Sequence, residues 1–251
     1  MNVALTRRLR SGLAVPAVFA LGATIIFVGL GTWQLQRKAW KEALIETLEQ
    51  RLSAPPGDLP PRERWASLSA ANDEFRRVKV SAAFVPGAEA LVYTSGSALR
   101  SDVSGPGYWV FAPVQLGSGG LVVVNRGFVP EGRQDLATRA AGAATGRADL
   151  VGALRWPESR GAFSPKDDPD RNIWFVRDPI AIAAAKSWGE VAPFFIELES
   201  PQPSGGLPRP GELKVNLRNE HLQYAITWYG LALVVVVLLG FWFSGGAAGA
   251  A

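Results

Sequence analysis

The only histidine of this chain, His221, stands where a charged stretch gives way to a long apolar run, in the segment RNEHLQYAITWYG. A helix that begins near Arg218 would place His221, Tyr224, Ala225 and Trp228 on one face, because residues three, four and seven apart are neighbours on a helix. Neutral imidazole is a common iron ligand, and a guanidinium such as that of Arg218 can bind a haem propionate bidentately. An interfacial histidine is more often a contact to lipid headgroups, so the spacing leaves both interpretations open.

The sequence offers little support for other chemistry. The chain has no cysteine, and its single histidine borders an apolar run, which excludes Ser–His and Cys–His nucleophiles in the intervening region. Carboxylates gather in DDPD (Asp167, Asp168 and Asp170) and in ELES (Glu197 and Glu199). The first group has no histidine or glutamate at ligand spacing, so we expect it to be a solvated loop and predict that the chain is not an enzyme.

Two uncharged apolar runs, residues 11–36 and 221–243, are the strongest features of the sequence. Each exceeds the roughly 20 residues that cross a hydrocarbon core about 30 Å thick. Lipid offers no hydrogen-bond partners, so the backbone N–H and C=O groups must pair within the segment, as they do in a helix. Both runs are therefore predicted to be transmembrane helices. Arg7, Arg8 and Arg10 resemble the basic region of a signal peptide, but the first run is too long and no A-x-A-like site follows it, which favours an uncleaved anchor.

The distribution of charge predicts the surroundings of the chain. Its net charge is +4 and its pI is 9.6, but Lys and Arg are scattered and gather mainly beside the apolar runs, as expected for contact with a lipid bilayer rather than with nucleic acid. The short tails, residues 1–10 and 244–251, suit the cytoplasm, which places residues 37–220 on the outside. Ten residues before the first run leave no room for a mitochondrial transit peptide. We therefore expect a bacterial inner-membrane protein with a periplasmic main domain.

The region between the runs, residues 37–220, is predicted to be an antiparallel β-rich α+β domain. It opens with an amphipathic helix in which Trp40, Leu44, Leu48 and Leu52 recur every four residues. Strands are expected at EFRRVKVSAAF, EALVYTS, YWVFAPVQL, LVVVNRGFVP, ADLVGALRW, NIWFVRD and PFFIELE, with GSGG as a hairpin loop. Strand follows strand with few helices between, which is typical of an antiparallel rather than a doubly wound fold.

Two local patterns in this domain predict particular geometry. The segment DPIAIAAAKSWG is expected to form a short helix that Asp178 caps, with Pro179 at its first position. In VNRGFVP, Arg126 and Gly127 are expected to end an apolar strand, with the glycine marking a bend of the backbone.

Three segments resemble a known family. GTWQLQRKAWK after the first run and NEHLQYAITWYGLA at the start of the second are similar to the signatures of the Surfeit locus protein one family, and VVVNRGFVP is similar to its third recognisable segment. Two terminal spans around one outer domain also match, so the resemblance covers essentially the whole chain. It implies a role in the assembly of cytochrome c oxidase, in which haem a is supplied to the catalytic subunit.

The resemblance further implies a site, a cargo and partners. Haem a would be bound transiently, with His221 as the iron ligand and with the oxidase catalytic subunit, haem a synthase and the lipid bilayer as partners. The residues implied for haem contact are His221, Arg218, Tyr224, Trp228, Trp33, Gln34 and Arg37, with Trp40 as a further candidate. The two tryptophans fit an interfacial aromatic belt equally well. The chain has one histidine, and its only methionine is Met1, so it cannot supply bis-His or His/Met ligation to an iron. The alternative is a membrane-anchored scaffold for an assembly intermediate that never binds haem.

Overall fold

The structure, a computed structural model, describes residues 3–214 and 219–248, with side chains over 15–214 and 219–243. The contacts divide the chain into two units, and each is described by itself. One unit, residues 1–46 and 217–251, contains most of α1 (Val3–Ser53) and all of α4 (His221–Ala248); we call it the helix pair. The other, residues 47–216, is the barrel domain.

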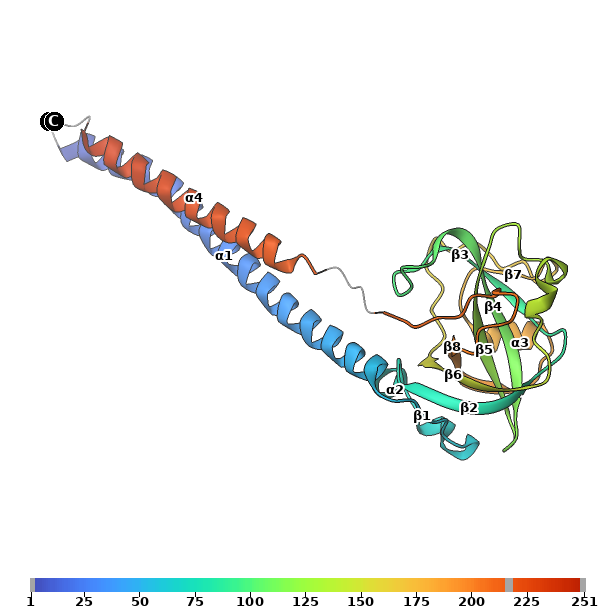
Figure 1. Cartoon of the computed structure of the whole chain (residues 1–251). Coiled ribbons are helices and arrows are strands. Elements are labelled where there is room, and N and C mark those ends of the chain that lie inside the picture. The colour runs from blue at the N-terminus through green and yellow to red at the C-terminus, as the bar shows by residue number, and fades with distance from the viewer. Residues whose placement is uncertain (1–2, 215–218, 249–251) are drawn as a thin grey trace. The chain divides into compact units, whose positions relative to one another are not determined.

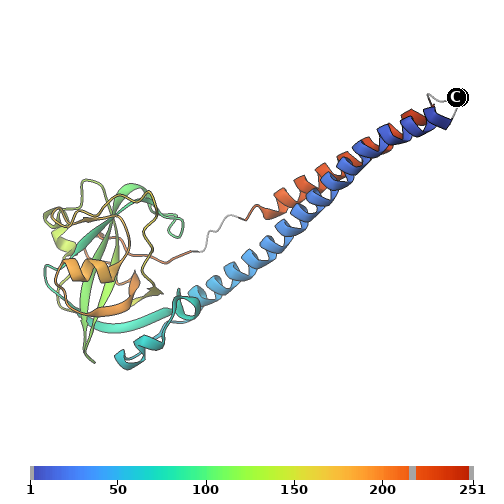
Figure 2. The same cartoon turned by 180° about the vertical axis from the view of Figure 1, so that it is seen from behind.

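Both helices of the helix pair are long and apolar enough to cross a membrane, over Val15–Ser53 and His221–Phe243 within the described residues. Only 6% of the apolar window of each is buried inside the protein, which distinguishes them from the core helix of a soluble domain. They run side by side in both views (Figures 1 and 2). These features fit the membrane protein that the sequence predicts.

The barrel domain consists of one sheet with the strand order β1-β2-β6-β8-β5-β4-β3-β7 over the described residues (Figure 1). A further pairing of β2 with β4 closes β2, β6, β8, β5 and β4 into a barrel. The strands are β1 (Gly57–Asp58), β2 (Arg77–Phe84), β3 (Ala90–Gly96), β4 (Ser104–Leu116), β5 (Leu121–Pro130), β6 (Arg147–Arg155), β7 (Ile173–Trp174) and β8 (Val191–Ser200). Closure leaves these five strands without a free edge between them.

The strand pairing confirms an antiparallel β-rich α+β domain, with one exception inside the ring. β5 and β8 run parallel, so that Val123 faces Phe195. A parallel pair needs a long crossover, and here the connection contains the 3₁₀ helix η2 (Leu136–Gly142), β6, β7 and the helix α3 (Pro179–Ala185). As predicted, the side chain of Asp178 caps α3, and it accepts hydrogen bonds from the amides of Ile180 and Ala181.

The core lies on both faces of the sheet. Apolar side chains from all five ring strands fill the barrel interior, where Trp65 of the 3₁₀ helix η1 (Arg62–Ser67) packs edge-on against Phe194. A second cluster on the outer face includes Phe111, Phe195 and Ile182 of α3, and α3 lies over that side of the sheet (Figure 2). The short helix α2 (Ala70–Asp73) precedes β2.

The predicted amphipathic helix is the last part of α1, but its apolar row is not continuous. Trp40 and Leu44 are exposed, whereas Leu48 and Leu52 pack against the cluster of Phe75 in the barrel domain. A spacing of four residues advances about 40° per step beyond a full helical turn, so a row of this kind drifts around the helix. Trp40 is thus about 80° around the helix from Leu48, and the four residues do not form one straight apolar face.

The prediction that Arg126 and Gly127 end a strand is wrong, because β5 continues to Pro130. The predicted bend is present: the register against β4 shifts at this point, and Gly127 has φ +117. A side chain at Gly127 would overlap the carbonyl of Arg209, which belongs to a segment paired with β5 through Phe128. The segment that requires the glycine is thus about 80 residues away in the sequence.

Candidate functional site in the helix pair

The two helices meet along a seam that repeats every seven residues. Buried and half-buried positions alternate at spacings of three and four along both helices, which is the arrangement of a coiled-coil seam. Contacts pair Phe27 with Trp228 and Gln34 with His221, so the helices are antiparallel. The seam contains Ala17, Ala20, Thr24, Phe27, Gly31 and Gln34 of α1, and His221, Ala225, Trp228, Ala232, Val235 and Leu239 of α4.

Small residues allow the helices to approach closely in the middle of this seam. Gly31 and Ala225 are both buried there. A Cβ added at Gly31 would lie 2.9 Å from ring atoms of Tyr229, closer than van der Waals contact permits. The Tyr229 hydroxyl also forms a 3.0 Å hydrogen bond with Oγ1 of Thr32. Glycine and alanine are the residues that permit such approach between helices in lipid.

His221 is the first residue of α4 and lies in the seam, half-buried. Its Nδ1 lies 2.7 Å from Oε1 of Gln34 on α1. An amide oxygen only accepts hydrogen bonds, so Nδ1 is the donor here, and in the neutral ring Nε2 then keeps its lone pair. A hydrogen bond at one ring nitrogen fixes the tautomer and the ring orientation, which is the usual support of a metal-binding histidine.

One side of the seam presents aromatic rings and a cation, and we call it the aromatic face: Trp33, Arg37, Trp40 and Tyr224. In an antiparallel seven-residue repeat these positions flank the seam on the same side, whereas Thr32 and Tyr229 flank it on the other. The Arg37 guanidinium carbon lies 5.9 Å from the ring centroid of Trp33 and 5.2 Å from that of Trp40. The rings of Trp33, Trp40 and Tyr224 are about half exposed.

The structure brings together most of the residues that the sequence singled out. Gln34, His221 and Trp228 lie in the seam, and Trp33, Arg37 and Tyr224 lie beside it on the aromatic face. The ring of Trp228 stacks on Phe27 at 5.7 Å between ring centroids. Arg218 lies outside the described residues. Sequence reasoning missed the packing partners Phe27, Gly31 and Thr32. The spacing of small and polar residues by three and four in the first apolar run could have revealed them.

The possible metal chemistry of this site is narrow. No group of three or more His, Cys, Asp or Glu side chains that could hold a metal ion occurs in the part of the chain that the structure describes. A bare transition-metal ion generally requires three or four protein ligands. His221 alone therefore does not make a site for a bare metal ion.

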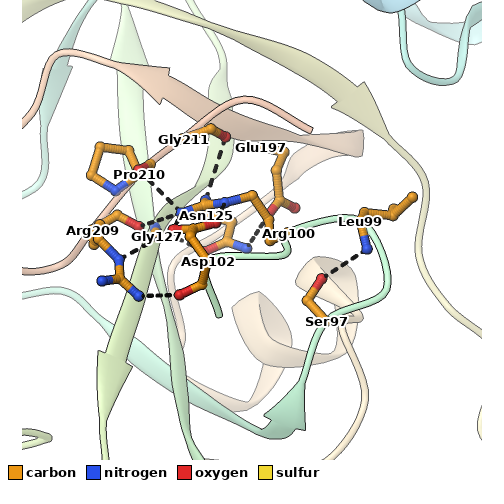
Figure 3. A network of polar contacts seen from close by, with 10 residues as sticks. All are labelled: Ser97, Leu99, Arg100, Asp102, Asn125, Gly127, Glu197, Arg209, Pro210 and Gly211. Atoms are coloured by element: carbon orange, nitrogen blue, oxygen red, sulfur yellow. Dashed lines mark hydrogen bonds and ion pairs between the residues drawn. The ribbon is translucent and has the colours of Figure 1, made fainter. Parts of the chain in front are cut away.

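The carboxylates noted in the sequence belong to structural networks of the barrel domain. Glu197 is buried and accepts a 2.9 Å hydrogen bond from the side chain of Asn125 (Figure 3). Glu199 binds Arg77 at 2.6 Å. In the predicted solvated loop, Asp167 instead accepts a 2.8 Å hydrogen bond from the amide of Phe175. These contacts give Glu197, Glu199 and Asp167 structural partners within the barrel domain.

A second network ties the segment after β8 to the loop between β3 and β4 (Figure 3). Arg100, which is 2% exposed, binds the carboxylate of Asp102 at 2.7 Å and donates to the carbonyl of Pro210 at 3.2 Å. Arg209 in turn donates to the carbonyl of Asp102 at 2.6 Å. The hydrogen bonds from Arg100 hold the pKa of Asp102 below its ordinary value.

The chain therefore combines two apolar terminal helices with a closed β-barrel domain between them, and it carries one histidine on the helix seam. The sequence profile of the SURF1 family matches residues 21–233, and the chain belongs to this family. It is 37% identical over 228 residues to a SURF1-like protein of Monosiga brevicollis, with 87% of this chain and 84% of that protein covered. It is also 38% identical over 225 residues to Surfeit locus protein 1 of Rattus norvegicus, covering 86% and 70% of the two chains. The corresponding human protein is 37% identical over 226 residues, with 86% and 72% covered.

Proposed function

We propose that this chain is a non-enzymatic assembly factor for cytochrome c oxidase that binds haem a at the helix pair and aids its insertion into the catalytic subunit. Membership of the SURF1 family supports the assembly role. The observation that carries the haem assignment is the pair of His221 and Gln34, since the 2.7 Å contact orients the imidazole and, in its neutral form, leaves Nε2 free to bind iron.

The proposed site has one protein ligand, because the chain has a single histidine and no cysteine. The porphyrin supplies four nitrogen ligands to the iron, and His221 supplies a fifth. The sixth position is left to water or to a group of the partner. Such a complex has only one protein–iron bond to break during transfer.

The aromatic face is the proposed surface for the macrocycle. The close approach of the helices at Gly31 leaves no space for a porphyrin between them at that level, so the ring would lie against the outside of the pair. Exposed Trp33 and Tyr224 offer apolar ring surface within about one helical turn of His221 and Gln34. Arg37 offers a guanidinium for a propionate.

We further propose that both helices cross a bacterial inner membrane with the barrel domain in the periplasm. The support is the apolar length of the helices and the basic N-terminal tail. Residues 37–220 would then be available to the oxidase catalytic subunit and to haem a synthase.

The test uses His221→Ala in the full chain, purified from cells that make haem a. We expect the variant to lose most of its co-purified haem absorbance and to support less oxidase assembly, while circular dichroism of the barrel domain is unchanged. Gln223→Ala is the matched control, since Gln223 is exposed on the same helix outside the seam. Unchanged haem content would remove His221 from the site. Lost haem with normal oxidase assembly would instead favour the scaffold role.

A further inference from the structure

One mouth of the barrel contains a charged side chain that the proposed function does not use. Arg126 of β5 is 6% exposed, and its Nη2 donates a 2.6 Å hydrogen bond to the carbonyl of Gly142. Its Nη1 is buried and has no hydrogen-bond partner. The guanidinium also lies 5.2 Å from the ring centroid of Phe84. A buried guanidinium nitrogen without a partner carries a desolvation cost that an acceptor would remove.

Arg126 forms no ion pair among the described residues, although the carboxylate of Glu89 is near enough to favour its charge. Among the described residues no carboxylate lies within 4.0 Å of this side chain, since none of the ion pairs formed there includes it. The carboxylate of Glu89 is already bound by Arg139, at 3.1 Å to Nη1 and also through Nη2. Burial lowers the pKa of Arg126 to about 10, so the group stays charged at neutral pH. A buried, unpaired cation is costly and favours an anionic ligand.

Arg126 lines a cavity of about 120 Å³. Its walls are formed largely by apolar side chains and by the loops that follow η2 and β8, with Thr145 and Gln202 as polar members. The remaining lining residues are Phe84, Ala143, Ala144, Leu150, Leu198, Pro201 and Pro203. A cavity of roughly 150 Å³ binds benzene, which has six heavy atoms, so this one has room for a ligand of four to six. The mouth of a β-barrel is a common place for such sites.

We propose that this barrel mouth binds a short-chain carboxylate, with the carboxylate against the guanidinium group of Arg126 and the alkyl chain against the apolar side chains of the wall. A guanidinium and a carboxylate form charge-assisted hydrogen bonds that are roughly twice as strong as neutral ones. The apolar side chains of the wall offer contacts to a two- or three-carbon chain that a fully hydrated inorganic anion does not make. This site is independent of haem and of the helix pair.

The experiment measures the unfolding temperature of the full chain in detergent by tryptophan fluorescence, at constant ionic strength. Sodium propionate is titrated against sodium chloride, with propionamide as the neutral isostere and sodium phosphate as the inorganic anion. At ten times its Kd, propionate is expected to raise Tm by about 3–6 °C. Neither propionamide nor phosphate is expected to produce a saturable rise.

Variants test the assignment to Arg126. Arg126→Met is expected to weaken propionate binding about ten- to hundredfold, the usual effect of losing a hydrogen bond to a charged group. Arg171→Met is the matched control, because Arg171 is 75% exposed and lies outside the cavity. Ala144→Leu keeps Arg126 but fills the cavity, so it is expected to abolish the rise of Tm with propionate. This second variant tests the site even if Arg126→Met does not fold.

Three results would overturn the proposal. An equal response to propionate and propionamide would show that the charge is not recognised. An unchanged propionate affinity in Arg126→Met, or in Ala144→Leu, would place binding elsewhere. An equal saturable response to phosphate would replace the carboxylate with a general anion site.

Discussion

The hydrogen bond between Gln34 and His221 allows a sharp test of the proposed haem site, through the substitution Gln34→Leu. Leucine is close to glutamine in size but removes the acceptor of the proton on Nδ1. The contact is short, at 2.7 Å, and joins the two helices at a half-buried position. Without the acceptor, the ring loses its fixed tautomer and orientation, while Nε2 stays chemically competent.

The expected magnitude follows from this positioning role. Removing the hydrogen-bond partner of a metal-binding histidine typically lowers metal affinity about 10- to 100-fold, which corresponds to about 1.4–2.7 kcal/mol. The assay is a spectrophotometric titration of haem into the full chain in lipid nanodiscs. Thr32→Val is the matched control, because it removes the 3.0 Å contact with Tyr229 on the other side of the seam and leaves His221 untouched. We expect this control to bind haem within about twofold of the unmodified chain, because it alters neither ring nitrogen of His221.

A double-mutant cycle separates positioning from a general loss of helix packing. If Gln34 acts through His221, adding Gln34→Leu to His221→Ala has no further effect on haem affinity, because the group that it positions is gone. Equal affinity of Gln34→Leu and the unmodified chain would refute the role of Gln34. Fully additive losses would refute the coupling and point to damage of the helix pair.

Three other predictions test the two units separately. Gly31→Val places a side chain against the ring of Tyr229 and is expected to weaken the association of the two helices by about 1–3 kcal/mol. The measurement is disulfide trapping between single cysteines introduced on each helix of this cysteine-free chain, which should decrease. Unchanged trapping would contradict the prediction. Gly127→Ala places a side chain at a residue with φ +117, against the carbonyl of Arg209. Urea unfolding should therefore show a loss of about 2–4 kcal/mol in the free energy of unfolding. A loss below about 0.5 kcal/mol would contradict this geometry. The hydrogen bonds from Arg100 lower the pKa of Asp102, so the stability that Asp102 contributes is present above its unfolded-state pKa of about 3.9 and is lost as pH falls through the lower folded-state value. In Asp102→Asn, the fall of the free energy of unfolding below about pH 4 should therefore be less steep. An unchanged fall would show that the ion pair contributes nothing to stability.

The sequence predicts much of the fold because local patterns determine most of its strands. Alternating apolar residues mark β2, and the Gly-rich connection marks the hairpin of β4 and β5. NIWFVRD, in contrast, forms only the two-residue strand β7, since just Ile173 and Trp174 pair with β3. Closure of the barrel was not predictable in the same way. It depends on pairing β2 with β4 and on the parallel register of β5 with β8, and neither leaves a local pattern in the sequence.

For the candidate site, the sequence likewise predicts which residues take part but not how they contact one another. His221 and Gln34 were both identified from the sequence, but their contact was not, because the two residues are 187 positions apart. Within a lipid-spanning run almost every residue is apolar, so hydrophobicity does not reveal which side faces the partner helix. Gly31 and Ala225 reveal it through their small size, which is a weaker pattern than amphipathicity.

The tightness of the seam has a consequence for the proposed delivery of haem. Because the helices are in contact at Gly31 and Tyr229, the cargo would lie on the exposed aromatic face and not in an enclosed cavity. Under the proposed function, release would require the breaking of one iron–histidine bond and the loss of ring contacts at Trp33 and Tyr224, without separation of the helices. A partner that approaches this face could supply the sixth ligand before the bond to His221 breaks. The free energy for transfer would then come from the second ligand and not from unfolding of the donor.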